Sequence, residues 1–225
     1  MLTTARHAST IVVIRDGDPG SHGTIEVLLL RRSDVGAFAG HWVFPGGRVD
    51  ETDAGADEIE RARCAGIREA REEVGLDLST SRLITWSHWS PPPIQPKRFL
   101  TWFFVAQWSG DDVVVDGHEI VDYAWHSPTD ALAKGLMLAP PTFVTLHQLA
   151  GRRDVAEVLG SGPAGGVEHF VTRPAKIGGD LVLMWHGDGG YDGNDPMSPG
   201  PRHRLTVRNG RTTDYVRSGV HPLPG

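Results

Sequence analysis

Three glutamates lie close together in one short stretch of the chain: Glu69, Glu72 and Glu73. In a helix, at about 100° per residue, this i, i+3, i+4 spacing places the three side chains on one face. Like charges at this spacing destabilise a helix on their own. A divalent cation among them would offset that repulsion, because Mg²⁺ and Mn²⁺ prefer carboxylate oxygen and water as ligands. The alternative is a solvated acidic face paired with arginine, and the spacing alone does not decide between the two.

A helix over residues 57–74 is predicted to carry these glutamates. Asp57 can cap its first turn, with Glu60 at the position of a capping-box partner. Gly75 supplies the left-handed residue that commonly follows a helix. Apolar residues gather on the side opposite the glutamates, as a core-facing stripe should: Ile67, Ala70 and Val74.

The segment from Arg68 to Leu76 reads R-E-A-R-E-E-V-G-L, and Gly46-Gly47 precede it. It resembles the Nudix box, G-x5-E-x7-R-E-U-x-E-E-x-G-U, where U is aliphatic. Every defined position of the second half is matched, with Ala70 a weak U. The resemblance implies a Nudix-type α/β/α sandwich with a mixed sheet. It also implies Mg²⁺ or Mn²⁺ as cofactor, and attack of water on a diphosphate linked to a nucleoside.

The first half of the box departs from the pattern. After five intervening residues, 48–52, Gly47 is followed by Asp53 instead of glutamate. Residues 54–67 then separate Asp53 from Arg68, where the pattern has seven residues. Alternatively, Glu60 keeps the seven-residue spacing to Arg68, and the extra residues lie between Gly47 and Glu60. The sequence leaves open which of the two acids takes the early position of the box.

The resemblance also implies particular site residues. Glu69, Glu72 and Glu73 are expected to bind the metal, with the Gly47 carbonyl as a further ligand. Arg68, four residues before Glu72, can partly neutralise the carboxylates and hold a glutamate side chain in one rotamer.

The general base is either one of the box glutamates or a residue of another loop. Glu119 is the leading loop candidate, because it begins an E-I-x-x-x-x-W element ending at Trp125 that is similar to one in the family. A surface carboxylate at a strand start is the equally weighted alternative. His118 and His88 could reach a substrate phosphate, although a histidine near a strand end is more often structural.

Residues 8–150 further resemble the Nudix branch that is linked to coenzyme A and acyl-CoA diphosphates. The similarity lies in L-L-L-R-R-S at residues 28–33 and in G-H-W-V-F-P-G-G at residues 40–47. Arg31, Arg32 and Arg98 could bind phosphate through bidentate contacts. Because side chains alternate along a strand, only one of Arg31 and Arg32 would face the site.

Three tryptophans could stack on a nucleotide base: Trp86, Trp89 and Trp102. Two of these three are expected to lie in the core instead.

Two other functions are possible on the same scaffold. A catalytically inactive module that binds or senses a nucleotide would be favoured by loss of a box glutamate, and all three are present. An isomerase of prenyl diphosphates would need a cysteine near a glutamate, whereas the single cysteine, Cys64, falls within the predicted helix.

Composition narrows the class of protein. The chain has 225 residues, 39% of them hydrophobic and 22% charged, which is ordinary for a soluble globular protein. Its net charge of −6 without a Lys/Arg-rich run argues against binding to a nucleic acid duplex. No apolar run approaches the ~20 residues of a membrane span, and the first residues lack an apolar signal core. We therefore expect a cytoplasmic protein that takes a small nucleotide-like substrate.

The surrounding elements divide the chain in two. Residues 1–158 are expected to form the mixed α/β domain, and residues 159–225 a Gly/Pro-rich, β-containing extension in which Asn209-Gly210 marks a hairpin turn. That extension could cover the site or exchange strands in a homodimer. Strands are expected over residues 9–14, 25–30, 42–44, 82–88, 99–108, 120–125, 168–172, 181–185 and 204–207, and further helices over 128–134 and Pro140–Leu149.

Overall fold

The computed structural model describes residues 5–17, 25–36, 38–92, 98–108, 110 and 113–220. The elements are, in chain order, β1 (Arg6–Asp16), β2 (Ile25–Arg32), β3 (Trp42–Val43), β4 (Gly46–Arg48), α1 (Glu58–Val74), β5 (Leu83–Ser90), β6 (Phe99–Gln107), β7 (Ile120–His126), α2 (Pro128–Ala133), α3 (Pro140–Leu149), α4 (Val155–Ser161), β8 (Glu168–Val171), β9 (Arg173–Ile177), β10 (Asp180–Met184), β11 (Arg202–Arg208) and β12 (Arg211–Ser218).

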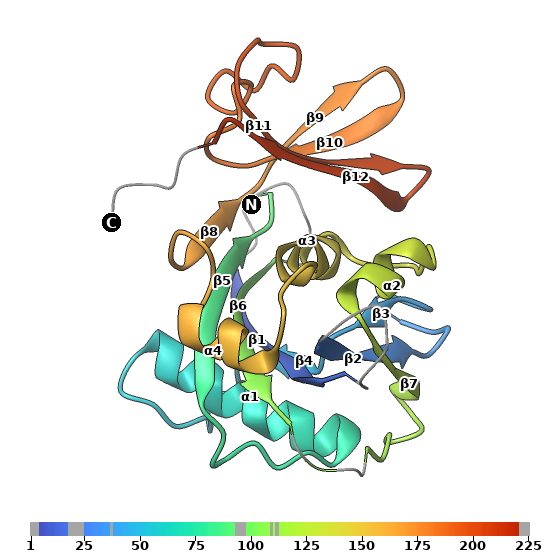
Figure 1. The fold of residues 1–225 in the computed structure, drawn as a ribbon, viewed down its shortest axis with the longest axis vertical. Coiled ribbons are helices and arrows are strands. Elements are labelled where there is room, and N and C mark those ends of the chain that lie inside the picture. The colour runs from blue at the N-terminus through green and yellow to red at the C-terminus, as the bar shows by residue number, and fades with distance from the viewer. Residues whose placement is uncertain are drawn as a thin grey trace.

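A mixed sheet forms the centre of the main domain (Figure 1). Its strand order is β3-β2-β1-β6-β5-β8, with β4 paired to β1 and β7 paired to β2. The pairs β1–β6 and β5–β8 are parallel, and the remaining pairs are antiparallel.

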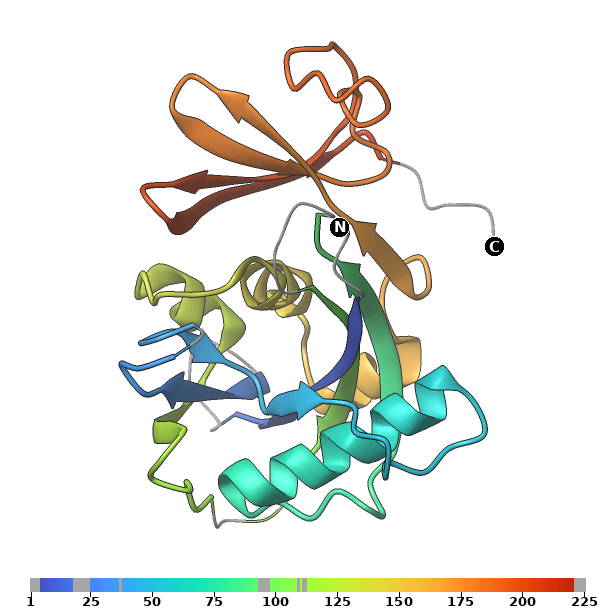
Figure 2. The same ribbon diagram turned by 180° about the vertical axis from the view of Figure 1, so that it is seen from behind.

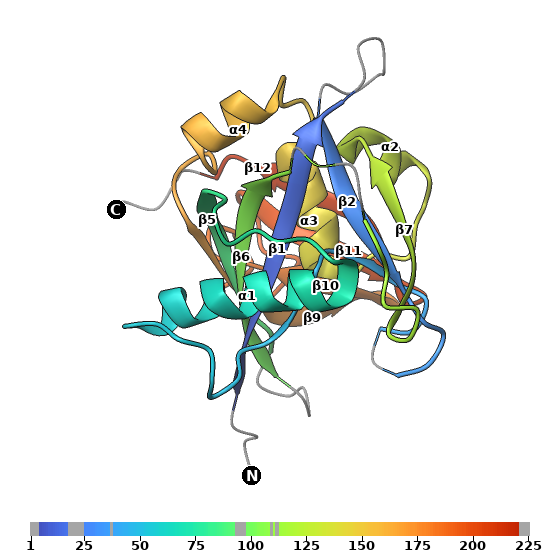
Figure 3. The same cartoon turned by 90° about the horizontal axis from the view of Figure 1, so that it is seen from below.

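Helix α1 covers one face of the sheet, and α2, α3 and α4 cover the other (Figure 3). The alternation along β1 fits this arrangement: Ile11 and Val13 pack in the core beneath α1, whereas Val12 and Ile14 pack in the core that includes α3. The α/β/α sandwich expected from the sequence is confirmed.

Helix α1 begins and ends with the predicted capping residues. Asp57 is its N-cap and accepts a 2.9 Å hydrogen bond from the Glu60 N–H. Gly75 follows the last turn with φ 71°, the left-handed conformation that glycine adopts without steric cost. The Glu60 carboxylate lies 3.5 Å from Arg63 Nε. These caps fix where the helix begins and ends, and so where its glutamates lie.

The C-terminal extension forms an antiparallel sheet in the order β12-β11-β10-β9, which lies over α3 on the side away from the main sheet (Figures 1 and 2). Asn209 and Gly210 have φ 50° and 76°, as the predicted β11–β12 turn requires. Leu183 and Leu205 from this sheet, and Trp185 directly after β10, join the core around α3. The extension is thus packed against the main domain through a shared apolar core.

The division expected after residue 158 differs from the structure. That position lies inside α4, and β8 then pairs in parallel with β5, so the main sheet continues to Val171. The small second sheet starts only at β9. The reason is that β8 supplies Phe170, which stacks on Trp89 and is fully buried.

Three short elements were not anticipated: β4, α4 and β9. The strand β4 is the important one here, because it follows the strand expected over residues 42–44 and contains both glycines that precede the box. The loop expected between β1 and β2 lies partly outside the described residues. Among the helices of the described segments, none has the length and apolar character needed to cross a membrane.

Candidate functional site

Two glycines of β4 bring the backbone against the glutamate helix. Gly46 has φ 154°, and a Cβ there would lie 2.3 Å from the Ser9 carbonyl oxygen. At Gly47 a Cβ would lie 2.3 Å from the carboxyl carbon of Glu69. Strand β4 can therefore fit against both β1 and α1 only because these two positions lack side chains.

Glu73 lies on the inner side of α1. The residue is 6% exposed, and its Oε2 accepts a 2.9 Å hydrogen bond from the Gly46 N–H. Burial, together with the charges of Glu69 and Glu119, raises the pKa of Glu73 to about 8, against the opposing effects of the Gly46 N–H and Arg32. The sequence placed Glu73 on the exposed side of the helix; it is instead turned toward β4.

Arg68 holds the other two glutamates of the box. Its Nη1 lies 2.9 Å from Glu69 Oε1 and 3.1 Å from Glu72 Oε2. Glu69 is partly buried, and that burial raises its pKa despite the neighbouring guanidinium of Arg68. Glu72 is more exposed, with 59% of its side chain accessible. Glu69 and Glu72 thus share Arg68, whereas Glu73 lies at the Gly46 N–H, and the three carboxylates differ in their degree of burial.

Asp53, and not Glu60, contacts the box arginine. Arg68 Nε donates to Asp53 Oδ1 at 3.0 Å and Nη2 to Oδ2 at 3.1 Å, while Asp53 Oδ2 also accepts from the Asp50 N–H at 2.7 Å. Burial acts to raise the pKa of Asp53, but the hydrogen bonds and charge of Arg68 outweigh it and hold that pKa below its ordinary value. The extra residues of the box therefore lie between Asp53 and Arg68.

We expect Asp53→Asn to lower the free energy of unfolding by about 1–3 kcal/mol at pH 7, because Arg68 loses a charged partner that is nearly buried. Since the folded pKa of Asp53 is depressed, its contribution is present above the ordinary value of 3.8 and is lost as the pH falls through the folded pKa. Thermal unfolding at pH 7 and pH 3 checks this. Glu60→Gln is the control; an equal or larger loss in that variant would contradict the assignment.

Glu119 lies near Glu73 and pairs with Arg32. The Arg32 guanidinium donates to Glu119 Oε1, and both groups act on the pKa of Glu73. Arg31 instead pairs with Asp34 at 2.9 Å. The expected alternation therefore separates the two arginines and brings Arg32 alone to the glutamates.

Asp116 organises the loop that carries Glu119, and the sequence interpretation overlooked it. Its Oδ1 accepts the N–H groups of His118 at 3.0 Å and Ile120 at 2.9 Å. Its own N–H donates to the Glu73 carbonyl at 3.1 Å. An aspartate two to four residues before the bonded N–H groups is a recognisable local turn signal. The loop is therefore fixed to the last turn of α1.

Trp86 does not offer a ring face to a substrate. It is 1% exposed, and its Nε1 donates to Gln148 of α3 at 2.8 Å. Trp89 and Trp102 are also buried, at 4% and 8%. Strand β5 is covered by α3 at this point. The sequence left one of the three tryptophans, Trp86 among them, to stack on a base, and all three are instead core residues.

Arg98 and His88 lie away from the box contacts described above. Arg98 precedes β6, and its Nε donates to the Pro91 carbonyl at 3.4 Å. His88 is half buried between the rings of Trp102 and His169, with centroids at 4.3 and 5.5 Å. Burial lowers the pKa of His88, which favours the neutral ring of a packed histidine.

The donor set around Gly47 fits a hard divalent cation in its chemistry. Glu69 and Glu73 are neighbouring, partly desolvated carboxyls whose pKa values are both raised, and a cation is the group that would offset their repulsion. Within the described residues, no three His, Cys, Asp or Glu side chains already converge as a complete ligand set. Glu72 accepts from Arg68 through Oε2 and would offer its other carboxylate oxygen to a cation.

In metal-free protein, Glu73→Gln is expected to raise the melting temperature at pH 8 by roughly 3–6 °C. In the unfolded chain the Glu73 carboxyl has a pKa of 4.5, whereas in the folded protein its pKa is about 8. The free energy of unfolding therefore falls as the pH rises from 4.5 to about 8. Glutamine removes this effect. Scanning fluorimetry in EDTA at pH 5 and pH 8 tests it, with exposed Glu72→Gln as control. A lower melting temperature for Glu73→Gln at pH 8 would contradict the expected charge effect.

Comparisons with known proteins identify the family of the chain. The family model described as the NUDIX domain matches residues 5–147. A Caenorhabditis elegans protein named putative nudix hydrolase 7 is 30% identical, over 58% of this chain and 58% of its own length. The chain thus spans a little over half of that curated relative.

Solved structures show the same fold. A NUDIX hydrolase from Alicyclobacillus acidocaldarius matches with TM-score 0.63 and 24% identity, covering 71% of this chain and 97% of that one. The NUDIX domain of Shewanella oneidensis NrtR, crystallised with ADP-ribose, matches with TM-score 0.50 and 18% identity, covering 64% and 86%.

Proposed function

The chain belongs to the Nudix family, and on that premise we propose that it hydrolyses a diphosphate linkage in a nucleoside-diphosphate-linked substrate. The observation that carries the proposal is the contact between β4 and α1. There, the buried Glu73 and the partly buried Glu69 lie against Gly46 and Gly47 with raised pKa values. A structural role alone would not require two desolvated carboxyls side by side.

The proposed metal ligands are Glu69, Glu72, Glu73 and the carbonyl of Gly47. Mg²⁺ or Mn²⁺, when bound, offsets the charge of a diphosphate and lowers the pKa of a water molecule. Arg68 acts as a positioning residue: it holds Glu69 and Glu72 from one side and is itself oriented by Asp53.

Glu119 is the proposed general base. Its carboxylate would take the proton from the attacking water, and the phosphorus–oxygen bond to the leaving phosphate would break as the new one forms. The Arg32 guanidinium and the Asp116 turn fix the loop and orient the Glu119 side chain. A box glutamate is the alternative base.

The proposed substrate class is a nucleotide diphosphate such as coenzyme A or an acyl-CoA. The support is the similarity of residues 28–33 and 40–47 to that branch of the family. Arg32 is the best placed of the three proposed arginines to contact a phosphate, because it lies at the glutamates, where it pairs with Glu119. Arg31 pairs with Asp34, and Arg98 donates to the Pro91 carbonyl.

A phosphate-release screen with Mg²⁺ or Mn²⁺ tests the function. It would compare CoA and its esters, ADP-ribose, NADH, dinucleoside polyphosphates and nucleoside triphosphates. We expect turnover of a diphosphate by wild type and its loss in Glu72→Gln plus Glu73→Gln, with Glu60→Gln as control. Unchanged activity in the double variant would overturn the mechanism. Turnover of another diphosphate without CoA or its esters would overturn the substrate class.

A further inference from the structure

Two aromatic side chains of the described residues are exposed to solvent, after the three tryptophans considered above are found in the core. Of the Phe, Tyr and Trp residues that the structure describes, only Phe38, at 55%, and Tyr123, at 38%, are exposed. Tyr123 lies within the regular strand β7. Phe38 is the more exposed of the two and lies in the loop that connects β2 to β3.

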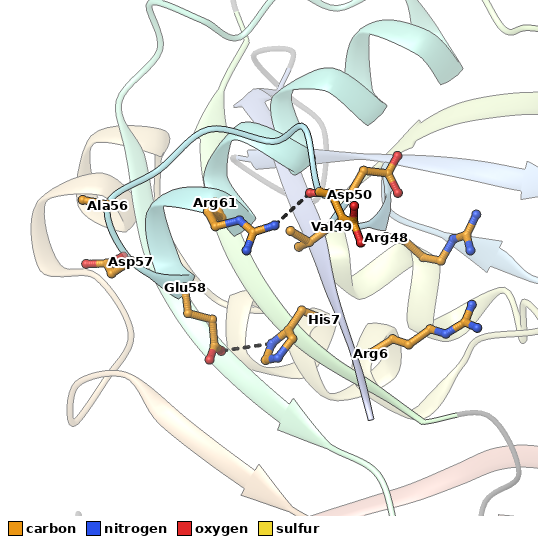
Figure 4. Close-up of a pocket in the computed structure, with 10 residues that line it drawn as sticks. Arg6, His7, Arg48, Val49, Asp50, Ala56, Asp57, Glu58 and Arg61 are labelled. Atoms are coloured by element: carbon orange, nitrogen blue, oxygen red, sulfur yellow. Dashed lines mark hydrogen bonds and ion pairs between the residues drawn. The ribbon is translucent and has the colours of Figure 1, made fainter. Parts of the chain in front are cut away.

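A hollow of about 600 Å³ at the start of β1 holds no such ring (Figure 4). Charged side chains of both signs form its walls; His7 lies 3.4 Å from Glu58, and Arg61 donates to the Asp50 carbonyl at 3.0 Å. Among the described residues that line it there is no Phe, Tyr or Trp, and none of the box glutamates. A base attached to a diphosphate at those glutamates has no stacking partner there.

The loop that carries Phe38 is bonded to the candidate site at both of its ends. At its start, the Ser33 N–H donates to the Glu119 carbonyl at 2.9 Å. At its end, the His41 carbonyl accepts a 2.9 Å hydrogen bond from the Arg32 N–H. The chain then continues through β3 into β4, which lies against the glutamates of α1. The loop is therefore continuous with the groups proposed to bind and hydrolyse the diphosphate.

Phe38 has a backbone conformation that is unfavourable for its side chain. Its φ is 57°, in the left-handed region that bulky residues rarely adopt. Its carbonyl accepts from the His41 N–H at 3.0 Å, and its ring meets the His41 ring edge-on with centroids 5.7 Å apart. The residue is nevertheless more than half exposed, so burial of the ring does not offset the strain. A strained residue that packing does not account for points to a role in binding.

We propose that Phe38 stacks on the base of the substrate nucleotide while the diphosphate lies at the glutamates. The proposal rests on the proposed diphosphatase function and adds a residue that determines specificity. A phenylalanine ring offers a face to a base without distinguishing one base from another by hydrogen bonds.

Two diphosphate analogues that resist hydrolysis test this by calorimetric titration with Mg²⁺. One is α,β-methylene-ADP, which carries a base, and the other is methylenediphosphonate, which has no nucleoside. Phe38→Asn removes the ring and suits a left-handed backbone, whereas Phe38→Tyr keeps the ring. Met197→Asn is the control, because Met197 is 71% exposed in a loop of the C-terminal extension.

We expect wild type to bind α,β-methylene-ADP about tenfold or more tightly than methylenediphosphonate. Phe38→Asn should weaken binding of α,β-methylene-ADP by about tenfold and leave methylenediphosphonate within about twofold. Phe38→Tyr and Met197→Asn should bind both ligands as wild type does. The melting temperature of Phe38→Asn should rise by roughly 2–4 °C, because the backbone strain is relieved.

Equal affinity of wild type for the two analogues, or unchanged binding of α,β-methylene-ADP by Phe38→Asn, would overturn the proposal. A lower melting temperature of Phe38→Asn would also overturn it, because the ring would then be a structural element of the loop. Hydrolysis of a diphosphate in the screen together with unchanged binding by Phe38→Asn would leave the proposed function intact. Conversely, a binding loss in Phe38→Asn without hydrolysis by wild type would overturn only the proposed function.

Discussion

Replacement of Glu69 by glutamine is expected to lower kcat at least ~100-fold while the fold is retained. The side chain keeps its volume and can still accept from Arg68 Nη1, which lies 2.9 Å from Oε1. What it loses is the negative charge beside Gly47, where a metal-bound diphosphate would need it. Steady-state hydrolysis of the best substrate from the screen, at saturating Mg²⁺, measures the effect.

The matched control for Glu69→Gln is Glu60→Gln, on the same helix but exposed and paired with Arg63. Its kcat should stay within about twofold of wild type. If Glu69→Gln also remained within twofold, Glu69 would not belong to the catalytic groups. Circular dichroism on both variants excludes unfolding as the cause of a loss.

Gly47→Ala is expected to reduce kcat by about 10- to 100-fold with little change in melting temperature. The new Cβ would lie 2.4 Å from Glu69 Oε1 and 2.6 Å from Oε2, so the Glu69 carboxylate must move away. Displacement of a reacting group by about 1 Å can cost about 100-fold in rate. The colliding atoms are the far end of a side chain, which can rotate, and so the fold tolerates the change.

Gly179→Ala provides the control, because a Cβ there meets nothing within 4 Å and its φ is not in the left-handed region. Gly46→Ala tests a glycine whose added Cβ would meet backbone instead of a side chain. Its Cβ would strike the Ser9 backbone, which cannot rotate away, so this variant should lose stability as well as activity. Full activity in Gly47→Ala would show that the Glu69 position is unimportant for turnover.

The features that were predictable from the sequence are local ones. Asp57 caps the beginning of α1 and Gly75 its end, each through hydrogen bonds to residues close by in the chain. The Asn209-Gly210 turn depends on its own backbone angles. The alternation that separates Arg31 from Arg32 is likewise a property of a single strand.

The features that were missed depend on contacts between distant segments. Whether Asp53 or Glu60 meets Arg68 is decided by how the long loop folds back, which no spacing in the chain expresses. Glu73 is buried because β4 pairs with β1 and places the Gly46 N–H beside it. Trp86 is buried because α3 covers β5 from 62 residues further along the chain, where Gln148 accepts its N–H.

Mn²⁺ binding measured by electron paramagnetic resonance tests the central claim most directly, because it reports on the metal without requiring a substrate. Wild type should bind Mn²⁺, and Glu69→Gln plus Glu73→Gln should weaken that binding by tenfold or more, while Glu60→Gln leaves it unchanged. Mn²⁺ binding of equal affinity in wild type and in the double variant would contradict the claim that these glutamates form the metal site.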